Sequence, residues 1–171
     1  MRIKLLVFIS FFLAEVQAQS KTEYLKQFTG FPLGASVDGE VLLKNKIYRD
    51  LVANEFNSLT TENHLKMYRV HPEQNKYDFA MGDSIVAFAL RNKMRVHGHT
   101  LVWFDGMADW VKNFQGTKQD WENLIKSHIQ TVVGHYKGKI ASWDVVNEYL
   151  TQDHDSVRKF IVQEKLGDDY M

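Results

Sequence analysis

The chain has 171 residues with 21 basic and 21 acidic side chains, so its formal net charge at neutral pH is zero. That balance lacks the positive charge on which binding to nucleic acid or anionic lipid depends, and it fits a neutral polymer better. The sequence contains no cysteine, which excludes a disulfide framework, a thiol nucleophile and thiolate metal ligands.

The first 18 residues have the pattern of a secretory signal peptide. Arg2 and Lys4 supply positive charge, residues 5–13 form an apolar run, and Ala18 closes a small-residue cleavage site. The run is too short to cross a bilayer, and no later stretch approaches the roughly 20 apolar residues that a membrane helix needs. We therefore expect a secreted or periplasmic protein without a membrane partner, whose folded part is residues 19–171.

Strand-like and helix-like segments alternate over residues 19–171, as is typical of βα units built around a parallel sheet. The longest helix is expected after Thr117, which forms an approximate capping box with Asp120. A last helix is expected to be capped by Asp155 and to end at Gly167. The pattern predicts one domain with about four βα units: strands at residues 30–36, 56–61, 94–103 and 140–146, and earlier helices at residues 41–55 and 81–92.

The second expected strand leads into the run Glu62-Asn63-His64-Leu65-Lys66. An acid, an amide and an ammonium at one strand end can form hydrogen bonds with sugar hydroxyls, whereas a purely structural loop would more often contain glycine or proline. A solvated charged loop is the alternative interpretation.

In the third expected strand, alternation of side chains places His97, His99, Leu101 and Trp103 on one face. The spacing of the two histidines is also found in zinc sites, but no third ligand is evident nearby, so we expect no metal. Among the other tryptophans, Trp121 and Trp143 are expected in the core, and Trp110 is left open.

The fourth expected strand, at residues 140–146, ends in Trp143-Asp144-Val145-Val146 and runs directly into Asn147-Glu148. A carboxyl group at the end of a buried strand is well placed for proton transfer, so Glu148 is the candidate proton donor. The alternatives are a glutamate that only caps or pairs at the strand end and a turn-forming asparagine.

These segments together resemble glycoside hydrolase family 10, the retaining endo-β-1,4-xylanases. The resemblance implies an α/β fold, a (β/α)8 TIM barrel that is incomplete here, with about its first four βα units, because a full barrel needs about 250 residues. It implies that Glu148 is the acid/base and that no cofactor is needed. The residues that it implies for substrate binding are Glu62, Asn63, Lys66, His99, Trp103 and Asn147.

The chain departs from the family pattern in two places. The family's nucleophile is a glutamate near the end of the seventh strand, and no residue here matches it, so we expect a truncated catalytic domain with little or no activity on xylan by itself. After Trp103 the family's usual His-containing loop is replaced by Phe104-Asp105-Gly106-Met107-Ala108. The alternatives are therefore a barrel hydrolase for another β-linked glycan and a non-catalytic half barrel that binds xylo-oligosaccharides. Exposed edge strands would also favour self-association.

Overall fold

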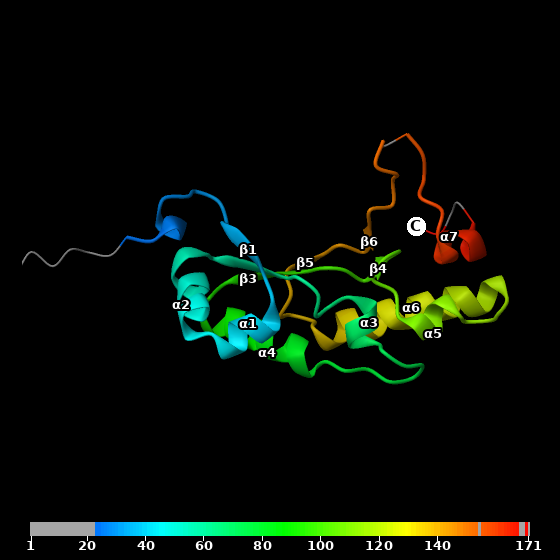
Figure 1. The fold of residues 1–171 in the computed structure, drawn as a ribbon, viewed down its shortest axis with the longest axis horizontal. Helices are drawn as coiled ribbons and strands as arrows, with labels where there is room; N and C mark the ends of the chain where they lie inside the picture. The colour runs from blue at the N-terminus through cyan, green and yellow to red at the C-terminus, as the bar shows by residue number, and fades with distance from the viewer. Residues whose placement is uncertain (1–22, 154, 168–169, 171) are drawn as a thin grey trace, which may run out of the picture.

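The computed structural model describes residues 23–153, 155–167 and 170 (Figure 1). The expected signal peptide at residues 1–18 lies outside them. A four-stranded parallel sheet with the order β1-β2-β3-β5 forms the centre. Because the strands are parallel, their carboxyl ends meet at one edge of the sheet. The strands are β1 (Gly34–Val37), β2 (Ser58–Thr61), β3 (Arg95–Gly98) and β5 (Ser142–Trp143).

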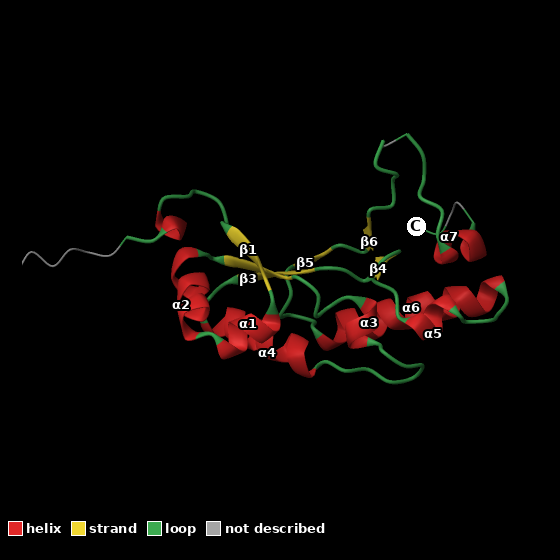
Figure 2. Cartoon of the chain, viewed as in Figure 1, coloured by secondary structure: helices red, strands yellow, loops and turns green. Residues whose placement is uncertain are grey.

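The main helices cover one face of this sheet (Figure 2). Val37, Leu59 and Val96 of the strands are at most 1% exposed and form one buried core with Ile85 and Ala89 of the helix that precedes β3. The helical elements are η1 (Leu25–Gln27), α1 (Gly39–Lys44), α2 (Lys46–Glu55), α3 (Met67–Val70), α4 (Ala80–Arg91), α5 (Asp109–Lys112), α6 (Lys118–His135) and α7 (Ile161–Leu166).

Two expected strands are each divided in two. The third ends at Gly98 and resumes as β4 (Val102–Trp103), and the fourth ends at Trp143 and resumes as β6 (Val146–Asn147); β4 and β6 form a separate parallel pair. The peptide bond between His99 and Thr100, in the interruption, is cis. The expectation of one alternating face from residue 97 to 103 is therefore wrong, because alternation requires a continuous strand.

The helices expected from the sequence are found except in two places, and η1, α3 and α5 are additional short elements. The expected helix at residues 41–55 is two helices, because Asn45 has an extended backbone and its side chain accepts a hydrogen bond from the Tyr48 amide at the start of α2. The proposed cap at Asp155 is wrong, since α7 begins after Phe160. Gly167 does end this helix, at a φ of 88° that suits glycine.

The start of α6 is as expected. The Asp120 amide donates to the Thr117 hydroxyl at 3.3 Å, and the Thr117 amide donates to the Asp120 carboxylate at 2.8 Å, which completes the capping box. Trp121 has no exposed surface, so its expected core position is confirmed. Trp143 is partly buried and packs against the core. Within the described residues, no helix is long and apolar enough to cross a membrane.

Candidate active site

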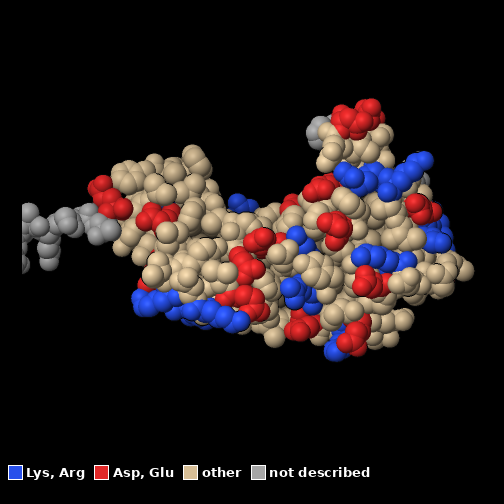
Figure 3. Space-filling view, in the orientation of Figure 1, with Lys and Arg blue, Asp and Glu red and all other residues tan. Residues whose placement is uncertain are grey.

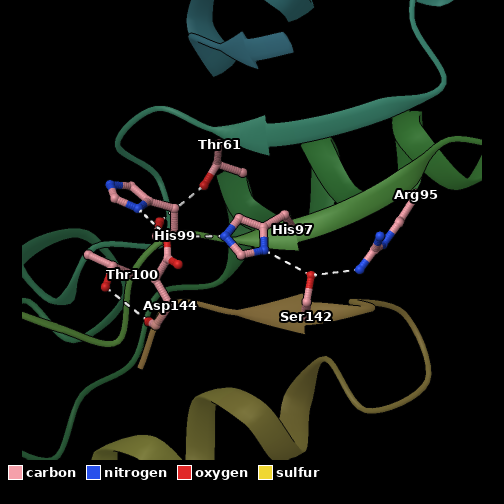
Figure 4. Close-up of polar contacts among 7 residues, drawn as sticks. All are labelled: Thr61, Arg95, His97, His99, Thr100, Ser142 and Asp144. Carbon is pink, nitrogen blue, oxygen red and sulfur yellow. Dashed lines mark hydrogen bonds and ion pairs between the residues drawn. The ribbon is translucent and has the colours of Figure 1, made fainter. Parts of the chain in front are cut away.

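Asp144 joins the two strand histidines at the carboxyl edge of the sheet (Figure 4). Its Oδ2 lies 3.1 Å from His97 Nε2 and 2.9 Å from His99 Nδ1. Burial opposes ionisation of this carboxyl group, but the hydrogen bonds from His99 and His97 outweigh that effect and lower its pKa. On its other side, His97 Nδ1 lies 2.9 Å from the Ser142 hydroxyl. The two imidazoles are therefore oriented by a carboxylate from the neighbouring strand.

The backbone of Asp144 also makes the connection between the two parallel strand pairs. Its amide donates to the Gly98 carbonyl at 3.0 Å, and its carbonyl accepts from the Thr100 hydroxyl and the Leu101 amide, each at 3.0 Å. Beyond this point Trp103 pairs with Asn147 in the ladder of β4 and β6. The segment that carries His99 and Trp103 is thus positioned by hydrogen bonds from the strand that leads to Glu148.

Asn63, Lys66 and Trp103 line one cavity of about 500 Å³ at this edge. The Lys66 ammonium donates to the Asn63 side-chain oxygen at 2.9 Å and lies 4.5 Å from the centre of the Trp103 ring. The indole nitrogen of Trp103 is buried and has no protein partner among the described residues. An ammonium, an amide and an indole ring beside an open volume suit a ligand with several hydroxyl groups and an apolar ring face.

The loop that follows Trp103 closes one side of this cavity. Gly106 allows that close approach, because a Cβ at this position would lie 2.9 Å from the Trp103 ring. The Gly106 carbonyl accepts from the Tyr68 amide at 3.1 Å, which ties the loop to α3. The cavity is also lined by Asp105, Met107 and Ala108 of the loop that the sequence linked to glycan choice, and by Tyr68, Pro72, Asp109 and Lys112, which the sequence did not indicate.

Glu148 lies at the end of β6 with an exposed side chain and a backbone φ of 52°. Positive φ is uncommon for a residue other than glycine, and such residues cluster at functional sites. Arg158 Nε donates to the Glu148 carbonyl at 3.0 Å, and its guanidinium lies 4.3 Å from the centre of the Phe104 ring. Glu148 and Arg158 line a different cavity, of about 460 Å³, from the one that contains Trp103.

The structure therefore places the predicted site residues in several environments. Glu62 is exposed, and its amide donates to the Val37 carbonyl at 2.9 Å. His99 contacts Asp144, and Asn147 is the ladder partner of Trp103. Asp144 is the central residue that sequence reasoning missed, although it lies inside the motif that pointed to Glu148.

Metal ligation is the other interpretation of the spacing of His97 and His99. No group of three or more histidine, aspartate or glutamate side chains in the described residues is arranged to hold a metal ion. Asp144 instead accepts hydrogen bonds from both imidazoles.

Comparison with known proteins relates this chain to one family of glycan hydrolases. The family pattern of Glycosyl hydrolase family 10 matches residues 21–171. A β-1,4-xylanase from Dictyoglomus thermophilum is 41% identical over 156 residues, which are 87% of this chain and 42% of that protein. Endo-1,4-beta-xylanase B from Thermotoga neapolitana is 39% identical over 124 residues, 72% of this chain and 36% of that protein. The chain thus spans about two fifths of the length of these relatives.

Solved structures show the same relationship. Native xylanase 10B from Thermotoga maritima superimposes with a TM-score of 0.74 and 36% identity, over 81% of this chain and 43% of that one. A variant of xylanase 10C from Cellvibrio japonicus, in complex with xylopentaose, gives a TM-score of 0.81 and 32% identity over 87% of this chain and 32% of that one. The parallel sheet and its helices therefore correspond to part of a TIM barrel, as expected.

Proposed function

The chain belongs to glycosyl hydrolase family 10, and we propose that it supplies the acid/base half of an endo-1,4-β-xylanase that cleaves xylan with retention of configuration. The observation that carries this proposal is the convergence of Asn63, Lys66 and Trp103 on one cavity beside the ladder that leads to Glu148. A neutral polysaccharide also fits the zero net charge.

In the proposed reaction, Glu148 protonates the leaving glycosidic oxygen and later removes a proton from the incoming water. Asn147 binds the 2-hydroxyl of the sugar at the cleavage point. His99, held by Asp144, and the Trp103 ring contact the same sugar, and Glu62, Asn63 and Lys66 bind hydroxyls of the neighbouring unit. The second carboxylate, which lies about 5–5.5 Å from the first and attacks the sugar, belongs to the part of the barrel that these 171 residues do not match.

The proposal is tested by completing the barrel. We would join this chain to the remaining βα units of xylanase 10B from Thermotoga maritima, which it resembles with a TM-score of 0.74. The chimera is expected to release xylo-oligosaccharides from xylan, whereas the 171-residue chain alone releases none. A folded chimera without hydrolysis would contradict the proposal.

In that chimera, Glu148→Gln is expected to slow the hydrolysis of substrates with poor leaving groups by about 10²–10⁴-fold, because the amide cannot donate the proton. Substrates with good leaving groups should be affected much less in the first step. Measuring kcat/KM on both substrate types separates loss of the acid from general damage. The matched control is Glu122→Gln, at an exposed position of α6, and it should leave both rates unchanged.

The second candidate function is binding of xylo-oligosaccharides without turnover. It is favoured by the separation of Glu148 from the cavity that contains Asn63 and Trp103. It predicts that the 171-residue chain binds xylotriose and that Glu148→Gln changes nothing in the chimera. Calorimetric titration, with Asn63→Ala as the binding-deficient variant, measures this directly.

The glycan itself is set by the loop at residues 104–108, which lines the cavity with Asp105, Met107 and Ala108. A barrel hydrolase for another β-linked glycan is the alternative within the same reaction class. Comparing rates of the chimera on xylan, cellulose and mixed-linkage glucan distinguishes the two. We propose xylan as the fastest substrate.

We also propose that the protein is exported after cleavage near residue 18. The support is the charge and hydropathy pattern of residues 1–18 in the sequence. Mass spectrometry of the secreted protein should find an N-terminus close to Gln19. An intact Met1 in protein recovered from cells would contradict it.

A further inference from the structure

Another cavity, of about 270 Å³, lies between the loop that follows α3, the helix α5 and the first half of α6. It shares no lining residue with the cavity that contains Trp103. Its volume is near the lower end of the range for small-molecule sites, which suits a single ring-sized group. Its walls are formed by His71, Gln74, Asn75, Tyr77, Trp110, Phe114, Asp120, Asn123, Leu124 and Ser127.

His71, which contributes to the wall of this cavity, is paired with the buried His128. His128 Nε2 is 3.1 Å from the Leu101 carbonyl, which can only accept, so this nitrogen must carry the proton. Burial lowers the pKa of His128 to about 4, so near neutral pH the ring is uncharged and its Nδ1 is an acceptor. His71 Nδ1, 3.2 Å away, must then donate.

This assignment leaves His71 Nε2 with a lone pair and no proton. The nitrogen is buried and has no protein partner in the described part of the chain, and the whole side chain is only 5% exposed. Burial lowers the pKa of His71 to about 4 as well, so this ring too is neutral near pH 7. A buried acceptor without a partner is unfavourable, and a hydroxyl or N–H from a ligand would satisfy it.

Aromatic rings hold this histidine and form the walls around it. The Tyr77 ring is stacked on His71 at 4.0 Å between centroids, and the Trp110 ring meets it edge-on at 4.7 Å. Trp110 Nε1 donates to the His71 carbonyl at 2.9 Å, so the indole has a fixed orientation. Rigid aromatic rings beside a polar acceptor are suited to a ligand that presents both an apolar face and hydroxyl groups.

The rim of the cavity is polar but carries little charge. Gln74, Asn75 and Asn123 contribute side-chain amides, and Ser127 contributes a hydroxyl. Asp120 is the charged residue in the lining, and its carboxylate is already bound to the amide and hydroxyl of Thr117. Amides and a hydroxyl both donate and accept hydrogen bonds, which favours a neutral polyol over an ion.

We propose that this cavity binds one sugar residue of a neutral glycan beside the rings of Tyr77 and Trp110, and that a small opening of the wall lets a ligand hydroxyl donate to the buried His71 Nε2. The inference rests on the proposed function for its choice of glycan, because it takes the ligand to be a xylan chain. One xylan chain could then occupy both this site and the Trp103 cavity, or two chains could bind, one at each site. Either arrangement would raise the local concentration of substrate.

The test uses the four indole N–H signals of the ¹⁵N-labelled 171-residue protein, followed by NMR during titration with xylotriose. Trp110 reports on the new cavity and Trp103 reports on the first, while Trp121 is buried and serves as an internal reference. Both the Trp110 and Trp103 signals are expected to move, with separate saturation curves. Tryptophan to phenylalanine variants assign the signals.

Matched variants separate the two sites. Ser127→Met places a longer side chain in the new cavity from an exposed helix position, and it should weaken the Trp110 response by at least about tenfold in affinity while the Trp103 response is retained. Gln130→Met makes a comparable change on α6 outside the cavity lining and should alter neither response. Asn63→Ala should abolish the Trp103 response alone.

The possible outcomes distinguish this inference from the proposed function. A Trp110 signal that stays fixed while Trp103 responds overturns the second site and leaves the proposed function intact. A response at Trp110 alone supports the second site and counts against the first. If neither signal moves, the second site is overturned, and the proposed function is judged separately by hydrolysis of xylan in the chimera. A Trp110 response that survives Ser127→Met also overturns the assignment of the second site.

Discussion

At the scale of single residues, Asp144 contributes to the site through both its side chain and its backbone. Its carboxylate accepts from His97 and His99, and its backbone connects β3 to the segment before β4. Because the side chain is 40% exposed, water screens part of this electrostatic stabilisation. Asp144 should therefore affect the orientation of the imidazoles more than the stability of the fold.

Asp144→Asn is expected to weaken xylotriose binding at the Trp103 cavity by about 5–10-fold, because a neutral amide oxygen in place of Oδ2 is a weaker acceptor for the two imidazoles than a carboxylate oxygen. The free energy of unfolding should fall by about 1 kcal/mol or less. The matched control is Asp83→Asn, which weakens a contact of 2.6 Å with His135 in another part of the molecule. Calorimetry should show weaker binding for the first variant only, and equal binding in both would refute the role of Asp144.

The pair of His71 and His128 predicts how stability depends on pH. Burial lowers the pKa of each from 6.5 to about 4, so between these values the unfolded chain binds protons that the folded chain does not. The contribution is complete above pH 6.5 and is lost as the pH falls towards 4. The rings of Tyr77 and Trp110 pack against His71.

The free energy of unfolding is therefore expected to be lower at pH 5 than at pH 7, by on the order of 2 kcal/mol for each histidine. Less urea should then be needed to unfold the protein at pH 5. The measurement is the unfolding free energy at half-unit steps of pH. His128→Asn should flatten this dependence, because one of the depressed pKa values is removed. Equal stabilities at pH 5 and 7 in the unsubstituted protein would contradict the assignment.

At the scale of elements, the Trp143 side chain of β5 packs directly against Gly98 of the neighbouring strand β3. A Cβ at Gly98 would lie 2.2 Å from the Trp143 ring, which packs against the core, whereas a Cβ at Gly134 of α6 would meet nothing within 4 Å. The contact has a functional consequence, because the Gly98 carbonyl accepts the Asp144 amide. The spacing of these two strands therefore also fixes the histidine contacts.

Gly98→Ala is expected to destabilise the protein by about 3 kcal/mol, within the range for overpacked cores, because the Trp143 ring must move. Gly134→Ala should stabilise it by about 0.5–1 kcal/mol, since alanine loses less backbone entropy in a helix. Thermal unfolding of the two variants measures both effects. A neutral result for Gly98→Ala would show that the ring moves aside easily.

At the scale of the whole molecule, β1 and β5 are the two ends of the strand order, and apolar side chains lie exposed near the first of them. Phe28 and Phe31 are 68% and 66% exposed, and Ile47 of the neighbouring α2 is 81% exposed. Positive and negative side chains are interspersed over the face shown in Figure 3. Exposed sheet edges and exposed apolar side chains favour association when the surrounding surface does not carry charges of one sign that would repel a second copy.

We predict that the 171-residue chain self-associates with increasing concentration. Ile47→Lys should extend the monomeric state to higher concentrations, because it replaces a highly exposed apolar side chain with a charged one. Leu90→Lys, the same kind of change on α4 at a residue that is 45% exposed, is the control. Sedimentation velocity measures the effect, and a monomer at all concentrations would rule out the association.

The sequence by itself determined the βα alternation, the capping box at Thr117, the stop at Gly167 and the motif that carries Asn63 and Lys66. These depend on periodicity and on contacts between residues a few positions apart, which are readable from one chain. Only the tertiary structure decided that the third and fourth strands divide near Asp144. It also placed Glu148 at positive φ in a different cavity from Trp103. The physical reason is that these features depend on hydrogen bonds between segments about 45 residues apart, such as His99 with Asp144, and local preference carries no information on them.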